Sequence, residues 1–128
     1  MQLGILSLGD LQRDQRTGRL HRPVDRMAEI LGYAVLADQL GLDVFALGEH
    51  HSADFLTSSP AVALAAAAAR TTAIRLTSAT TLLGVADPVR VYEDFASLDL
   101  ISRGRAEIIV GRSAFADATE IAPALRSA

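Results

Sequence analysis

Short apolar runs alternate with longer amphipathic stretches along this chain. Four runs rich in apolar and branched residues, at 2–8, 43–47, 74–83 and 106–110, are each followed by glycine and are typical of buried β-strands. Between them, apolar residues recur at spacings of three and four, which predicts helices at 23–40 and 88–103. A further helix at 61–70 has almost no polar face, so we expect it to be buried or covered.

Proline and glycine mark the ends of the predicted helices. Ser59-Pro60 and Asp87-Pro88 each pair a capping side chain with a proline whose backbone is preset for helix entry. Gly41 is the expected stop of the first helix. These signals place each helix between two strands.

The order of strands and helices predicts a parallel sheet. No hairpin dipeptide lies between apolar runs, and every connection between strands is long enough for a helix, so the crossovers should be right-handed. The fold class is therefore α/β, built from βα units with parallel strands. Two architectures fit this pattern, an open doubly wound sheet and part of a (βα)8 barrel.

Composition narrows the classes of partner. The 128 residues are enough for one domain. A net charge of -3 provides no basic field, so we expect neither nucleic acid nor membrane as a partner. The chain has no cysteine, which excludes disulfides and thiol nucleophiles. We find no signal segment and no apolar run near the roughly 20 residues that span a bilayer, so we expect a cytoplasmic protein.

The candidate chemistry begins with Glu49-His50-His51, which follows the second predicted strand. Side chains near a strand end alternate in direction, so we expect one histidine to be catalytic and the other structural. A neutral imidazole with a pKa near 6.5 can take or give a proton at cellular pH. Two alternatives stay open: loop histidines that bond carbonyls or water, and a metal-dependent hydrolase using Glu49, His50 and Asp54.

Two other segments carry polar groups at strand ends. Residues 78–81 (SATT) are small and polar, which suits a flat ligand close to the backbone but also fits an ordinary strand. Arg112 follows the fourth strand, where two roles are open: it could bind an anion, or it could be a solvated surface charge. Arg103, Arg105 and Glu107 are expected to be exposed or paired edge charges. The Walker, GxGxxG and GxSxG patterns are absent.

Taken together, these motifs resemble a known enzyme family. EHH after the second strand, TSATTLL in the third, DPVRVYEDFASLDLISRGR as the third helix and VGR at the end of the fourth strand resemble the bacterial luciferase-like flavin-dependent monooxygenases over residues 2–112. The resemblance implies a (βα)8 TIM barrel that binds reduced FMN, or in some members a deazaflavin, at the carboxyl ends of its strands. It further implies oxidation of a small organic substrate with O2, and a flavin reductase that supplies the reduced flavin.

The resemblance also implies roles for individual residues. His50 matches the family's active-site histidine, as the proton-transfer residue. Ala79-Thr80 matches a non-proline cis peptide under the flavin ring, and Arg112 matches an arginine near the flavin phosphate. The flavin-contacting positions that it implies are Leu8, Gly9, His51, Ala79, Thr80 and Arg112. It implies no metal ligand.

The chain also departs from the family. Members run to more than twice this length, so we expect residues 1–112 to be the N-terminal half of a barrel, in a truncated form with reduced or no activity alone. Residues 113–128 form an atypical tail, expected to be disordered or a marginal helix. A half barrel leaves its edge strands open, which favours a homo-oligomer. The alternative function is a non-catalytic half-barrel remnant that acts through dimerisation or partner binding.

Overall fold

The structure is a computed structural model that describes residues 1–112. Strands and helices alternate throughout this part of the chain. The elements are β1 (Gly4–Ser7), α1 (Pro23–Gln39), β2 (Val44–Leu47), α2 (Pro60–Ala68), β3 (Arg75–Leu82), α3 (Pro88–Ser102) and β4 (Ala106–Gly111). The predicted α/β fold of βα units is confirmed. The expectation for residues 113–128 lies outside the described residues, and the domain boundary at residue 112 stays a prediction.

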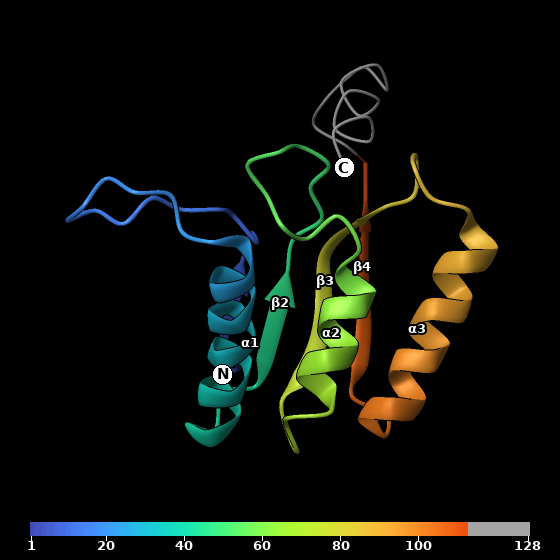
Figure 1. Cartoon of the computed structure of the whole chain (residues 1–128). Coiled ribbons are helices and arrows are strands. Elements are labelled where there is room, and N and C mark those ends of the chain that lie inside the picture. Colours follow the sequence, from blue (N-terminus) through green and yellow to red (C-terminus); the bar gives the residue numbers. More distant parts are fainter. Residues whose placement is uncertain (113–128) are drawn as a thin grey trace.

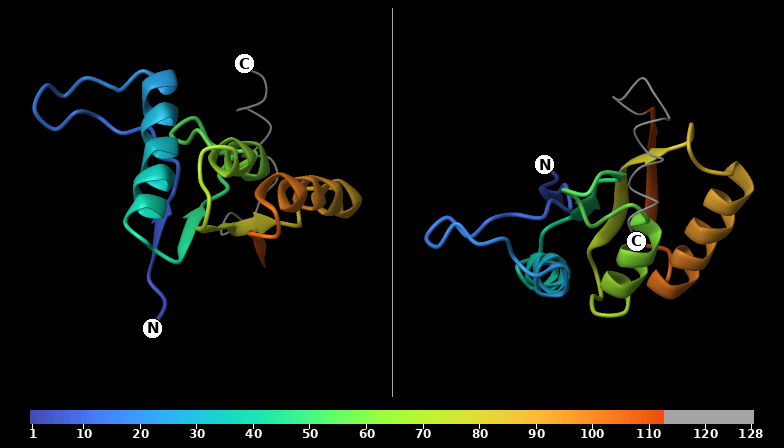
Figure 2. Two further views of the ribbon diagram at one scale, coloured as in Figure 1. Left: turned by 90° about the horizontal axis from the view of Figure 1, so that it is seen from below. Right: turned by 45° about the horizontal axis from the view of Figure 1, so that its top comes forward.

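The sheet has the order expected of consecutive barrel strands. All four strands are parallel and hydrogen-bonded in the order β1-β2-β3-β4 (Figure 1). The three helices lie on one side of this curved sheet (Figure 2). A doubly wound sheet carries helices on both faces, whereas a barrel carries them only outside. The fold is therefore that of part of a barrel, and the open-sheet alternative is wrong.

The core lies between the sheet and the helices. Ile5, Phe45, Leu76 and Ala106 are aligned across the four strands by the register and belong to or pack against the buried cluster. Because alternate side chains point to opposite faces, these residues define the outer face of the sheet. The helices contribute Ile30, Leu64 and Leu98, among others, to the same cluster.

The inner face of the sheet is uncovered within the described part of the chain. Leu6, next to Ile5 in β1, therefore points inward and is 54% exposed, and Ile109 in β4 is 48% exposed. Arg75 and Glu107 form an ion pair of 2.6 Å between β3 and β4. Among residues 1–112, no further strand pairs with the outer edges of β1 and β4. These edges and the open inner face agree with the expectation for a partial barrel.

The apolar helix α2 is largely covered, as predicted. Ala63, Leu64 and Ala67 are buried, whereas Val62 is 70% exposed. Small alanine side chains let α2 lie close to the sheet and to α3. Within residues 1–112, no helix combines the length and the apolar character needed to cross a membrane.

The two predicted helix caps behave differently. Asp87 accepts hydrogen bonds from the backbone N–H groups of Val89 (2.8 Å) and Arg90 (3.1 Å) at the start of α3, which confirms the prediction. Ser59 makes no such side-chain bond, so that half of the Ser59-Pro60 prediction is wrong. Its ψ of 80° lies away from the extended conformation seen at Asp87 (ψ 123°).

The expectation that Arg105 is an exposed or paired edge charge is wrong. Its guanidinium donates to the carbonyl oxygens of Ser102, Ile74, Ala68 and Thr71 at 2.8–3.1 Å, and to Thr71 Oγ1 at 2.9 Å. The carbonyl ends of α2 and α3 converge at this point, and a guanidinium offers five donors to satisfy them. Arg105 therefore joins the elements at the end of the sheet opposite the candidate site.

Candidate functional site

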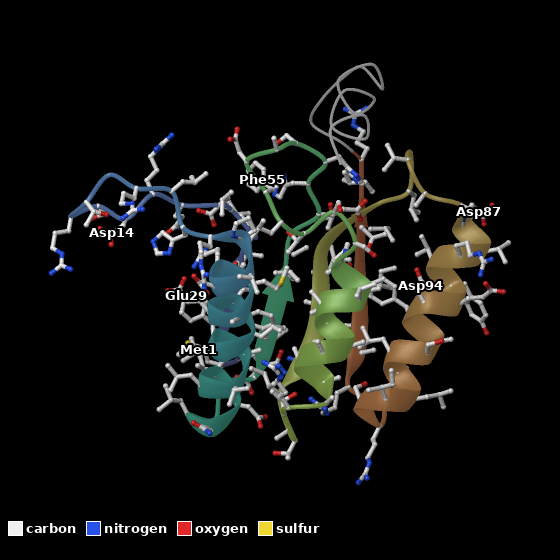
Figure 3. The ribbon with its side chains drawn as sticks, viewed as in Figure 1. Met1, Asp14, Glu29, Phe55, Asp87 and Asp94 are labelled. Atoms are coloured by element: carbon white, nitrogen blue, oxygen red, sulfur yellow. The ribbon has the colours of Figure 1, made fainter. Side chains whose placement is uncertain are left out.

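The loops after β1 and β2 are hydrogen-bonded to each other beyond the carboxyl ends of these strands. The Leu11 N–H donates to the Asp54 carbonyl (2.7 Å), and the Leu56 N–H donates to the Gly9 carbonyl (2.8 Å). Phe55 lies in this second loop, above the sheet (Figure 3). The pairing fixes both loops at the end of the sheet where active sites of barrel enzymes lie.

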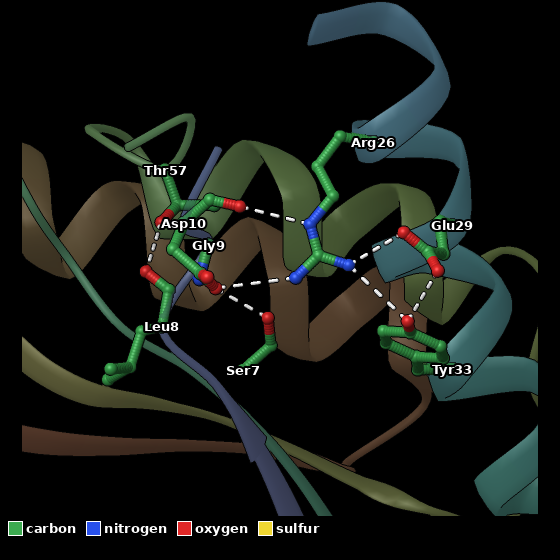
Figure 4. A network of polar contacts seen from close by, with 8 residues as sticks. All are labelled: Ser7, Leu8, Gly9, Asp10, Arg26, Glu29, Tyr33 and Thr57. Atoms are coloured by element: carbon green, nitrogen blue, oxygen red, sulfur yellow. Dashed lines mark hydrogen bonds and ion pairs between the residues drawn. The ribbon is translucent and has the colours of Figure 1, made fainter. Parts of the chain in front are cut away.

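Gly9 and Thr57 are in close contact between these loops. Thr57 is 1% exposed, and its hydroxyl donates to the Leu8 carbonyl (3.3 Å). Gly9 has φ +74°, and a Cβ atom there would lie only 2.0 Å from Thr57 Oγ1. The Gly9 N–H donates to Ser7 Oγ (3.2 Å), as Figure 4 shows. Only glycine fits both this backbone conformation and this distance.

A buried arginine on α1 holds the loop after β1. Arg26 is 4% exposed and donates from Nε to the Asp10 carbonyl (3.0 Å) and from NH2 to the Asp10 carboxylate (3.3 Å). Its NH1 donates to Glu29 (2.7 Å) and Tyr33 (3.3 Å) (Figure 4). Partial burial raises the pKa of Asp10, but hydrogen bonds from Gln12 and the backbone, together with the charge of Arg26, lower it below its usual value.

His50 is held by stacking and by its backbone. The His50 ring stacks on the Phe55 ring with 4.0 Å between centroids. The backbone N–H of His50 donates to the Thr57 carbonyl (3.2 Å). A Cβ atom at Gly48 would lie 3.1 Å from His50 Nε2 and 3.3 Å from Leu8 Cα, so the imidazole lies beside the end of β1.

Two effects lower the pKa of His50. Partial burial is the larger one, and the neighbouring His51 adds to it, while Glu49 and Asp10 oppose the shift. Burial disfavours the charged imidazolium. The ring is therefore neutral at neutral pH, with a nitrogen free to accept a proton.

His51 has a different partner from His50. Its Nε2 lies 2.8 Å from Glu49 Oε1, and Glu49 Oε2 accepts the backbone N–H of Leu82 (3.0 Å). A carboxylate only accepts hydrogen bonds, so Nε2 of His51 carries the proton. The two adjacent histidines thus have separate environments, as the alternation at the strand end predicts.

The end of β3 is irregular at the predicted ligand position. The peptide bond between Ala79 and Thr80 is cis, as the resemblance implies, and the register with β4 shifts between Ala79 and Thr81. Thr81 Oγ1 donates to the buried Ser78 Oγ (2.7 Å). A Cβ atom at Gly111 would lie 2.6 Å from Thr80 Oγ1. The short distance at Gly111 shows that β4 lies close to Thr80 of β3 at this point.

The predicted site residues therefore form two groups at one end of the sheet. The group at the ends of β1 and β2 consists of Leu8, Gly9, His50 and His51. The group at the ends of β3 and β4 consists of Ala79, Thr80 and the exposed Arg112. The carboxylate of Glu49 connects the end of β2 with the end of β3.

The geometry does not favour the metal-dependent hydrolase. Glu49 directs its carboxylate to His51 and Leu82, and His50 stacks on Phe55. Among residues 1–112, no three histidine, aspartate, glutamate or cysteine side chains come together as a metal-binding group.

Sequence reasoning missed three residues that organise the site. Arg26 precedes Ile30 by four positions on the apolar stripe of α1, so its burial could have been found from the helical period. Glu49 was considered only as a metal ligand. Thr57 carries no local signal, because its role depends on contact with Leu8 and Gly9, 49 and 48 positions earlier.

Comparisons with known proteins identify the family of this chain. The sequence model of the luciferase-like monooxygenases matches residues 1–123. The oxygenase component of the flavin-dependent trigonelline monooxygenase of Acinetobacter baylyi is 30% identical over 88 residues, 68% of this chain and 24% of the relative. The chain spans 21–28% of the length of the curated relatives that it matches.

Solved structures show the same fold. Monooxygenase RslO1 from Streptomyces bottropensis superposes with a TM-score of 0.80 and 30% identity, over 98% of this chain and 36% of that chain. The oxygenating constituent of 3,6-diketocamphane monooxygenase from Pseudomonas putida, solved with FMN, gives a TM-score of 0.77 over 90% of this chain and 30% of that chain. Its 24% identity supports the fold alone. With the family model matching nearly its whole length, this chain belongs to the luciferase-like monooxygenase family.

Proposed function

We propose that this chain supplies the reduced-FMN site of a luciferase-like monooxygenase, which oxidises a small organic substrate with O2. The observation that carries the proposal is the position of His50 Nε2, beside Leu8 at the open end of the sheet. The predicted flavin contacts at the ends of β3 and β4 lie at the same end. Family membership supports the chemistry.

The residues present fit a flavin. Leu8 is 48% exposed at the end of β1, and Ala46, which pairs with Leu6, is a small residue on the inner face of β2. Gly48 leaves room beside His50 where a side chain would approach both His50 and Leu8. A flat ring with an apolar face suits such a surface. Arg112, exposed after β4, would bind the flavin phosphate.

His50 would act as the proton-transfer residue. Reduced flavin, when bound, supplies two electrons to O2, so that one oxygen atom enters the substrate and the other leaves as water. The lowered pKa keeps His50 neutral at neutral pH, which allows its ring to accept a proton from a reacting group and return it. Stacking on Phe55 holds the ring in one orientation and covers one of its faces.

The proposal extends to the partners of the reaction. A separate flavin reductase would supply reduced FMN, by analogy with the trigonelline relative, which is an oxygenase component. A deazaflavin is the alternative cofactor. We propose a cytoplasmic homo-oligomer, because the edges of the sheet that are open within residues 1–112 favour pairing with another chain.

A non-catalytic role is the second candidate. Ile108, Ile109 and Val110 on the edge strand β4 are 41–54% exposed, and exposed apolar strands favour association with another chain. In this alternative the half barrel acts through dimerisation or partner binding, without flavin.

Flavin titration under anaerobic conditions separates the two. We expect the purified chain to bind reduced FMN in the micromolar range, and His50→Ala and Arg112→Ala to weaken binding. Arg16→Ala, an exposed arginine in the loop after β1, is the matched control and should bind as the unaltered chain does. Absence of binding, together with a dimer in analytical ultracentrifugation, would favour the non-catalytic role.

A further inference from the structure

Glu49 links two strands through both oxygens of one buried carboxylate. The residue is 8% exposed. Its Oε1 accepts from His51 Nε2 (2.8 Å), and its Oε2 accepts from the Leu82 N–H (3.0 Å). We call these two hydrogen bonds the Glu49 bridge. A buried carboxylate with both oxygens occupied by donors is held in one orientation.

The Glu49 bridge begins where the backbone ladder between the strands ends. The β2–β3 register runs from Val44↔Arg75 to Leu47↔Ser78 and stops there. Leu82 lies four residues beyond Ser78, past the irregularity at Ala79-Thr80. The bridge therefore joins the segment after β2 to the far side of the predicted flavin contact.

We propose that Glu49 is a positioning residue for the flavin site, which holds the Ala79-Thr80 segment of β3 in place relative to His50. This inference rests on the proposed function, because it concerns how the same site receives its flavin. Glu49 need not touch the flavin, since it acts through His51 and through the backbone of Leu82. Its carboxylate joins His51, in the first group of site residues, to Leu82, two residues beyond Thr80 of the second group.

The bridge also determines which ring nitrogen of His51 donates to Glu49. A carboxylate only accepts hydrogen bonds, so His51 donates from Nε2. Glutamine has the same shape but offers one acceptor and one donor. If the amide oxygen of the introduced glutamine accepts the Leu82 N–H, its NH2 group faces His51. Nε2 of His51 must then accept a hydrogen bond, so its proton moves to Nδ1. Glu49→Gln therefore alters the bridge while conserving its volume.

The test compares Glu49→Gln with Glu93→Gln in the full chain. Glu93 is an exposed glutamate on α3 that pairs with Arg90, so it controls for the loss of one negative charge. We expect Glu49→Gln to move the imidazole ¹⁵N signals of His51 to the Nδ1–H pattern. The Leu82 amide should exchange faster, because a neutral amide oxygen is a weaker acceptor than a carboxylate. Glu93→Gln should change neither.

Binding is measured with reduced FMN on variants that are equally folded by circular dichroism. We expect Glu49→Gln to bind about tenfold more weakly, equivalent to roughly 1.4 kcal/mol, and to change the visible circular dichroism band of bound FMN. A purely structural role would lower the melting temperature but leave the affinity of the folded protein and this band unchanged.

The outcomes separate the two proposals. If the unaltered chain binds FMN and Glu49→Gln binds it equally well with an unchanged spectrum, the positioning role is wrong and the proposed function stands. If the unaltered chain does not bind FMN, the proposed function fails and the positioning role fails with it. Should Glu49→Gln not fold, Glu49→Asp and His51→Asn are measured by the same readouts, and full affinity in both would overturn the inference.

Discussion

The ring of His50 stacks on the ring of Phe55, with centroids 4.0 Å apart and an interplanar angle of 21°. The partner comes from the loop that is hydrogen-bonded to the loop after β1. The stack therefore ties the orientation of the predicted proton-transfer residue to the packing of two loops. It also contributes to the partial burial that lowers the pKa of His50.

Removing the stack should raise the pKa of His50 toward its ordinary value. Phe55→Leu exposes the imidazole, which reduces the penalty on its charged form. An NMR titration of the His50 ring protons measures this directly. Phe95→Leu, which removes a ring at the core on α3, is the matched control and should leave the His50 titration unchanged. An unchanged titration in Phe55→Leu would show that burial of His50 has another source.

The same pKa shift predicts how stability depends on pH. His50 has a lower pKa in the folded chain than the value of 6.5 for an unperturbed histidine, so between these two values the unfolded chain binds more protons. The free energy of unfolding should therefore fall as the pH falls from 6.5 to the folded pKa. Denaturation with urea at several pH values should show a shallower fall in His50→Gln. An equally steep fall in that variant would assign the effect to other groups.

Loss of Arg26 should destabilise the protein more than loss of a nearby exposed arginine. Arg26→Ala removes the buried guanidinium that donates to the Asp10 carbonyl and carboxylate, and we expect a loss of about 2 kcal/mol. Arg22→Ala removes a solvent-exposed pair with Asp25 and should destabilise the protein much less, because solvent screens such a pair. Chemical denaturation of the two variants gives the comparison. Equal losses would mean that Arg26 does not hold the loop after β1.

Substitutions at two glycines with similar backbone conformations can distinguish the cost of steric overlap from the cost of a positive φ. Gly9 (φ +74°) and Gly18 (φ +69°) both lie in the left-handed region, but only Gly9 has a neighbour, Thr57, where a Cβ would be placed. Gly18→Ala should cost about 1 kcal/mol. Gly9→Ala should cost about 1–3 kcal/mol more, as thermal unfolding can show. Similar melting temperatures for the two variants would contradict the close contact with Thr57.

Local patterns in the sequence predicted the elements better than the contacts between them. The apolar periods and Asp87 are local, and the helices and the α3 cap lie where they indicate. Arg105 looked like a solvated charge because nothing near it in sequence shows that the carbonyl ends of two helices converge there. Serine is a residue type that commonly caps helices, but the backbone conformation of Ser59 does not bring its hydroxyl into a capping hydrogen bond.

The candidate site shows the same division. The motif series predicts a cis peptide at Ala79-Thr80, which the structure contains, and His50 as the proton-transfer residue, which stays a prediction. The close contact between Gly9 and Thr57 depends on two loops that are far apart along the chain, and no sequence period encodes such a pairing. The sequence does not predict that Glu49 is the partner of His51 either. The direction of the Glu49 carboxylate depends on the end of β3, which supplies its other donor.

The central claim is that reduced FMN binds at the carboxyl ends of the strands, beside His50. Backbone amide NMR of the ¹⁵N-labelled chain, recorded anaerobically during titration with reduced FMN, tests it most directly. The account predicts saturable shifts at the positions of the two groups, Leu8, Gly9, His50, His51, Ala79, Thr80 and Arg112, with little change around Arg105 at the opposite end of the sheet. No saturable shift, or shifts confined to the region of Arg105, would contradict it.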